Sequence, residues 1–168
     1  SGNKEYAELV VVGSSTCTTI SCVDLRGYYL DDNNGTFATG AGTGIQMGCI
    51  HFTNDVLWSC VPVGTIIVIY NEADVNANMP AQDLSTSDGN CRLIISGDNS
   101  TLFERHPSLP SVATAAFPTS GFVSTGGWNT TVTLANGGDS FQTRDASGNL
   151  LSAVSWGNDN TFDIIYFA

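Results

Sequence analysis

The sequence is poor in charge, and in positive charge above all. Charged residues make up 12% of its 168 residues, about half of the usual share in globular proteins. Only 5 are lysine or arginine, against 16 aspartate or glutamate, which gives a formal net charge of −11. Because nucleic acids and anionic membranes are bound through lysine and arginine, this balance argues against both as partners. Divalent cations, neutral glycans and other proteins remain as candidates.

Long apolar runs are absent. The longest, Ile66–Tyr70, is far shorter than the roughly 20 residues of a membrane-spanning helix, so we expect no membrane insertion. No secretory leader is recognisable, and we expect the chain to be a mature or excised product. Its length predicts a single domain over residues 1–168, large enough to bury a real core.

The motifs of common catalytic sites are missing as well. The chain has two histidines, no Cys-x-x-Cys and no Gly-x-Ser-x-Gly, which argues against a zinc site and a hydrolase nucleophile. The glycines of residues 36–48 do not form a phosphate-binding pattern. Cys49 and His51 lie two positions apart on one expected strand, and a separation of roughly 7 Å is too long for an activated pair. We therefore expect no enzymatic activity.

Five cysteines favour disulfide bonds in an oxidising compartment, and hence an extracellular or cell-surface location. Cys60 precedes one strongly β-prone segment and Cys91 opens the next, which predicts a bridge between them. Cys17 and Cys22 are close enough in sequence to close a small loop. Cys49 is then left over, either as a buried free thiol or as an intermolecular link.

Short β-prone segments separated by turn signals predict an all-β fold, an antiparallel β-sandwich with long irregular loops. Ile66–Tyr70 has no polar face and is expected to be a central strand. Helical turns are expected at Asn54–Ser59, begun by an Asn or Asp cap, and at Ser100–Arg105. The expected strands are Glu5–Gly13, Val23–Leu30, Cys49–Phe52, Thr65–Asn71, Cys91–Gly97, Val132–Leu134, Asp139–Arg144, Leu150–Trp156 and Thr161–Ala168.

The stretch Val23–Gly35 changes its apolar parity at Gly27, which predicts a bulge or bend there. It ends in an acidic tip. The hard oxygens of Asp31, Asp32 and Asn33 are a candidate calcium site, but they are too few for the six to eight ligands of calcium. An Asx-rich turn is the alternative.

Three tryptophans are candidate sugar platforms. Trp156 alternates with an apolar residue and is expected in the core. Trp128 follows two glycines and is the one most expected to be exposed. Trp58 lies in the expected helical turn. For all three we expect packing in or around the core rather than a sugar platform, because tryptophan is usually mostly buried.

The last eight residues form a spare apolar strand whose members include Phe162, Ile164, Ile165, Tyr166 and Phe167. A sandwich that lacks a strand and carries a spare one can assemble by strand complementation between copies. The alternative is that Thr161–Ala168 fills the vacant place in its own domain.

Three segments in order carry a family resemblance. The first two are Glu5-Tyr-Ala-Glu-Leu9 and Val23-Asp-Leu-Arg-Gly-Tyr-Tyr-Leu-Asp-Asp32. The third is the closing hairpin Thr131–Gly157, with Leu134-Ala-Asn-Gly-Gly-Asp139 and Arg144-Asp-Ala-Ser-Gly-Asn149 leading to Val154-Ser-Trp-Gly157. Together they resemble the lamin tail domain in its bacterial extracellular form, which implies an immunoglobulin-like β-sandwich. Arg26 and Tyr28 replace the usual serine and tryptophan, and the apolar strand that usually precedes the Glu-Tyr strand is missing.

The resemblance implies an accessory module of a bacterial surface or secreted protein, with no catalytic residues to carry over. Chromatin contact, known for nuclear members, does not fit a charge of −11. We therefore expect a non-catalytic extracellular structural or adhesion module, in its sharpest form a homopolymer built through terminal strands. Its partner would be a further copy or a cell-surface protein. The alternative is a glycan- or calcium-dependent binding module appended to a secreted enzyme.

Overall fold

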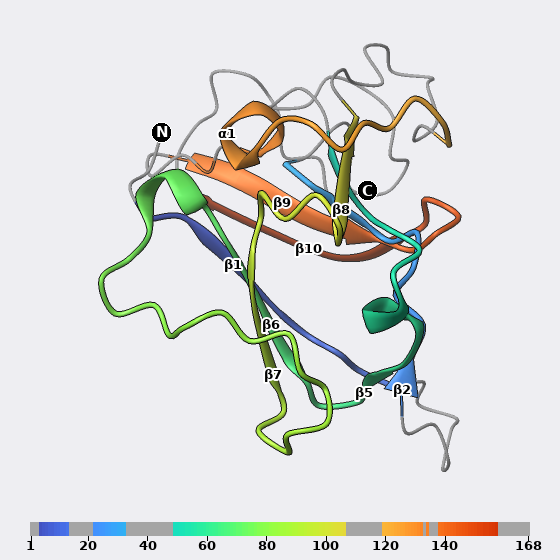
Figure 1. Ribbon diagram of the computed structural model, residues 1–168. Coiled ribbons are helices and arrows are strands. Elements are labelled where there is room, and N and C mark those ends of the chain that lie inside the picture. The colour runs from blue at the N-terminus through green and yellow to red at the C-terminus, as the bar shows by residue number, and fades with distance from the viewer. Residues whose placement is uncertain are drawn as a thin grey trace.

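The computed structural model describes residues 4–13, 22–32, 49–106, 119–132, 134 and 138–157. These residues form an all-β fold with only short helical turns (Figure 1), which confirms the predicted all-β class. The strands are β1 (Tyr6–Val10), β2 (Cys22–Val23), β3 (Tyr29–Asp31), β4 (Cys49–Phe52), β5 (Val61–Pro62), β6 (Ile66–Tyr70), β7 (Arg92–Ser96), β8 (Phe103–His106), β9 (Gly138–Arg144) and β10 (Leu150–Gly157). The helical turns are η1 (Val56–Cys60), η2 (Glu72–Asp74) and α1 (Trp128–Thr131).

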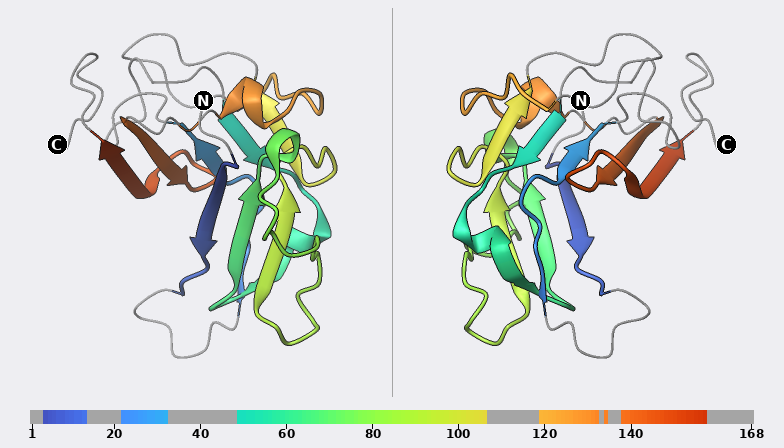
Figure 2. Two further views of the ribbon diagram at one scale, coloured as in Figure 1. Left: turned by 90° about the vertical axis from the view of Figure 1, so that its left-hand side faces the viewer. Right: turned by 90° about the vertical axis from the view of Figure 1, so that its right-hand side faces the viewer.

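The strands are arranged in two main sheets and one small one. A three-stranded sheet has the order β1-β6-β7, and a five-stranded sheet has the order β10-β9-β3-β4-β8. β2 and β5 form the third sheet, of two strands. Figure 2 shows β9 and β10 extending to one side beyond β1, on the side away from β6 and β7. The larger sheet therefore reaches past the smaller one at this side.

The pairing of β6 with β7 differs from the antiparallel prediction, because these two strands run parallel. A parallel pair needs a crossover of a dozen or more residues, and the long polar connection of residues 71–91 supplies it. β6 is the central strand of its sheet, as its uniformly apolar sequence predicts, and Ile67 and Ile69 are buried.

The predicted bend at Gly27 is where the chain passes from one sheet to another. β2 pairs with β5, and β3 joins the five-stranded sheet. Gly27 has a φ of +78°, and a Cβ there would lie 3.1 Å from the Cβ of Ala146, so the position favours glycine. On either side of this turn Leu25 is buried and Tyr28 packs against the same core.

An aromatic cluster forms one end of the core. The rings of Phe52 and Trp58 lie 4.6 Å apart between centroids, and Phe103 packs edge-on against Phe52 at 5.3 Å. The indole N–H of Trp58 donates to the carbonyl oxygen of Leu102 at 3.0 Å, which satisfies its polar end. The turn η1 that carries Trp58 begins at Asp55, whose side chain accepts from the amide of Leu57. This is the predicted cap.

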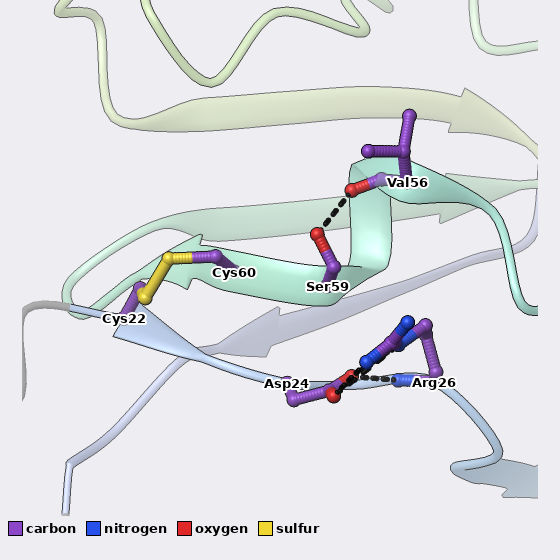
Figure 3. The surroundings of a disulfide bond; sticks show 6 residues. All are labelled: Cys22, Asp24, Arg26, Val56, Ser59 and Cys60. Atoms are coloured by element: carbon purple, nitrogen blue, oxygen red, sulfur yellow. Dashed lines mark hydrogen bonds and ion pairs between the residues drawn. A yellow bond between two sulfur atoms is a disulfide. The ribbon is translucent and has the colours of Figure 1, made fainter.

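The disulfide predictions are wrong in their pairing. Cys22 is bonded to Cys60, because β2 pairs with β5 and brings the two Cα atoms to 5.0 Å (Figure 3). Cys91 is therefore not bridged to Cys60, and it is an exposed free thiol before β7. Cys49 is the buried free thiol that the sequence analysis gave as one alternative. Cys17 lies outside the described residues and cannot bond Cys22, which is already bridged.

Two further predictions of local structure are wrong. The expected helix at Ser100–Arg105 is a turn followed by β8. The side chain of Asn99 accepts from the amide of Thr101 at 3.0 Å, and the chain then becomes extended. Instead of a strand at Val132, the structure has the turn α1, closed by a bond of 2.7 Å from the amide of Val132 to the carbonyl oxygen of Trp128.

Candidate functional site

A groove of about 530 Å³ lies between β1 and the larger sheet. Its walls are mostly apolar and come from β1, the segment after β2, and the start of β10. The lining residues are Glu8, Leu9, Val10, Val11, Val12, Val23, Leu25, Tyr28, Tyr29, Phe52, Ile67, Thr143, Leu151 and Ser152.

One wall of the groove is the outer edge of β1, which has no neighbouring strand among the described residues and is called the free edge below. The carbonyl of Glu5 accepts from the amide of Asn71 at 3.0 Å, and the amide of Val11 donates to the carbonyl of Thr65 at 2.9 Å. Hydrogen-bonding pairs alternate along an antiparallel strand, so the odd-numbered residues of β1 bond β6. The backbone groups of the even-numbered residues (Tyr6, Glu8 and Val10) therefore point away from β6, along the free edge.

The start of β10 forms part of the opposite wall through Leu151 and Ser152, and Val154 lies further along the same strand, outside the lining. Val154 pairs with Phe141, which is buried in the core, and Trp156, two residues further on, packs against the same core. Val154 therefore points to the interior side of the sheet, yet its exposed fraction is 55%. Leu151, beside the groove, is 53% exposed. Interior-facing apolar side chains of β10 are uncovered because β1 is the last described strand of the opposing sheet.

Two of the other sheet edges are partly covered. Beyond β7, Asp83 makes an isolated antiparallel bridge to Ile94, with both hydrogen bonds formed at 2.9 and 3.0 Å. Beyond β8, Val123 makes an isolated antiparallel bridge to Arg105, again with both hydrogen bonds formed. Such short bridges shield an edge from pairing with another chain. Among the described residues, the edges of β1 and β10 carry no bridge of this kind.

The start of β1 is held in place by a tryptophan. The indole N–H of Trp128 donates to the carboxylate of Glu5 at 2.8 Å, and its backbone amide donates to Asp98 at 2.7 Å. Trp128 is completely buried, which confirms the core packing expected of the tryptophans, but the prediction that it is the most exposed of the three is wrong. The two glycines before it allow α1 to fold over the sheet, since a Cβ at Gly127 would collide with Asp98. Trp58 is buried too, and none of the three tryptophans is an exposed platform.

The acidic tip is buried rather than open. Asp31 and Asp32 are fully buried, and Asp31 accepts from the side-chain amide of Gln142 at 2.6 Å. Gln142 in turn accepts from the guanidinium of Arg144 at 2.8 Å, and Asp31 opposes the lowering of the Arg144 pKa by burial. This series of hydrogen bonds from Arg144 through Gln142 compensates the buried negative charge of Asp31. Asn33 lies outside the described residues, among which no three acidic, histidine or cysteine side chains form a metal-binding group.

Cys49 and His51 share one face of β4, as predicted, and pack against Tyr29 and Phe122. The His51 ring stacks on Phe122 with centroids 4.2 Å apart. Burial raises the pKa of the Cys49 thiol well above its usual value, and burial lowers the pKa of His51 despite its contact with Glu104 at 3.3 Å. A catalytic cysteine needs a lowered pKa, so this arrangement fits packing better than nucleophilic chemistry.

No protein-family model, no curated protein and no solved structure matches this chain. None of the helices in the described segments has the length and hydropathy needed to cross a membrane. The expected assembly strand, Thr161–Ala168, lies outside the described residues. The groove beside β1 is therefore the candidate site that the described residues build most completely.

Proposed function

We propose that this chain is a non-catalytic extracellular structural module of a bacterial surface or secreted protein, and that it self-assembles by adding a strand at the free edge of β1. The observation that carries the proposal is the position of this edge beside the uncovered inner face of β10. A strand added to β1 would both satisfy the outward backbone groups and cover Leu151, which lines the groove, and it could extend over Val154 further along β10.

The energetics support strand addition at this edge. Fully burying one valine or leucine side chain stabilises a complex by about 1.5–3 kcal/mol relative to exposure. Val154 and Leu151 each start about half exposed, so covering them contributes roughly half of that value apiece. An uncovered apolar edge otherwise promotes uncontrolled aggregation, and a specific partner strand removes that hazard.

The location and family parts of the proposal have separate support. The Cys22–Cys60 disulfide favours an oxidising compartment, as do the low content of charged residues and their replacement by Ser, Thr, Asn and Gly. The adhesion role and the bacterial source rest on the resemblance to extracellular lamin tail domains.

The test is a proline on the free edge of β1. Glu8→Pro removes an N–H that points away from β6, so it blocks an added strand while the β1–β6 ladder stays intact. The matched control is Glu8→Ala, which removes the same side chain and keeps the N–H. We expect negative-stain microscopy and light scattering to show polymers for the parent chain and for Glu8→Ala, and monomers for Glu8→Pro. A parent chain that is uniformly monomeric, or a Glu8→Pro chain that still polymerises, would refute the proposal.

A further inference from the structure

The C-terminal apolar segment has one face that suits the groove. In an extended strand alternate residues share a face, so Phe162, Ile164 and Tyr166 lie together and are all apolar or aromatic. The other face carries Thr161 and Asp163 together with the apolar Ile165 and Phe167. The described lining of the groove includes Glu8 and no lysine or arginine, so it offers no opposite charge to a buried Asp163. The first face therefore fits the groove better than the second, because only the second would bury a carboxylate.

The length of the segment matches the edge. Its eight residues, 161–168, extend over about 26 Å, whereas the five residues of β1 extend over about 17 Å. One segment can thus pair with all of β1 and continue past the exposed Val12 at the end of the groove. Three residues, 158–160, separate it from the end of β10.

The strand directions favour a segment from another molecule. In both views of Figure 2, β1 points downward and β10 points obliquely upward, so the two strands differ in their general direction. A segment that reversed after Gly157 and returned along its own groove would run parallel to β1. Parallel pairing is slightly less stable per residue than antiparallel pairing. A segment from a second copy can enter from either end and is free to pair antiparallel.

From these observations we infer that the groove beside β1 receives residues Thr161–Ala168 of a second copy, with Phe162, Ile164 and Tyr166 facing Val154 and Leu151. This inference rests on the proposed assembly function and names the donor, the acceptor and the register. Register matters because a shift by one residue would exchange the two faces of the donor strand.

The test changes each face of the donor in the full chain. The triple variant Phe162→Ser, Ile164→Ser, Tyr166→Ser alters the inward face, and the matched control Ile165→Ser, Phe167→Ser alters the outward face. In light scattering at a concentration where the parent chain is assembled, we expect the triple variant to be monomeric and the control to be assembled. Equal loss in both variants, or assembly of the triple variant, would overturn the inference.

Mixing two defective chains tests whether the exchange occurs between molecules. The triple variant keeps an intact groove, and Glu8→Pro keeps an intact donor segment. Each alone should be a monomer, and their mixture should give a species of twice the monomer mass. A mixture that stays monomeric overturns the inference.

The failures of the two proposals are distinguishable. If Glu8→Pro abolishes assembly but the triple variant does not, strand addition at β1 survives and only the donor is wrong. If the triple variant lowers the melting temperature of a monomeric parent chain, the segment fills its own groove, and exchange between copies is wrong.

Discussion

Replacing Cys22 and Cys60 together with serine should remove the crosslink with little other change. Cys60 is exposed and Cys22 is partly exposed, so the serine hydroxyls are not forced into the core. The bridge joins positions 38 apart in sequence. Chain-entropy treatment of a loop of this length gives a stabilisation of about 4 kcal/mol, because the bridge restricts the unfolded state. For a domain of this size the melting temperature should fall by about 8–16 °C.

The assay is urea denaturation of the double variant, with Cys91→Ser as the matched control. Cys91 is an exposed free thiol, so its replacement should leave the free energy of unfolding unchanged. A loss below about 1 kcal/mol in the double variant would refute the reasoning, because a bridge across a loop of this length should contribute more. An equal loss in the control would instead implicate Cys91 in a bond of its own.

Three further predictions concern single side chains. Trp128→Phe removes the hydrogen bond to the buried carboxylate of Glu5 and should cost about 1–3 kcal/mol in urea denaturation; a change within error would show that this bond does not hold the start of β1. In the native protein a maleimide should label Cys91 and leave Cys49 unmodified until denaturant is added, and equal labelling rates would contradict the burial of Cys49. Burial lowers the pKa of His51 in the folded state, so below about pH 6.5 the unfolded state binds more protons than the folded state. The free energy of unfolding should therefore fall as the pH drops from about 6.5 toward the lowered pKa. The variant His51→Gln should flatten this pH dependence, and an unchanged slope would show that another group causes it.

Local signals predicted many elements correctly. Gly148 has a φ of +82°, and Asp145 bonds the backbone of the hairpin turn, as the turn residues predict. The cap at Asp55 and the strand Cys49–Phe52 were equally visible in the sequence. In each case the physical cause lies within a few neighbouring residues.

Contacts between distant segments were not predictable in the same way. The disulfide partner of Cys22 is decided by the pairing of β2 with β5. The burial of Trp128 depends on its hydrogen bond to the carboxylate of Glu5, which is 123 positions away in the sequence. The contact of Gln142 with Asp31 joins strands 111 positions apart, and only the alternation of β9 hinted that Gln142 shares a face with Arg144. The open edge of β1 could not be predicted from local sequence either, because it depends on how far the distant strand β10 reaches past β1.

Amide hydrogen exchange along β1 tests the central claim most directly. In the dissociated chain the amides of Tyr6 and Glu8 point to the free edge and should exchange rapidly, whereas those of Ala7 and Leu9, which point to β6, should be protected. In the assembled protein, Tyr6 and Glu8 should become as protected as their neighbours, and in Glu8→Pro the amide of Tyr6 should remain fast. Unchanged exchange of Tyr6 and Glu8 in a protein that does assemble would show that the added strand does not lie at β1.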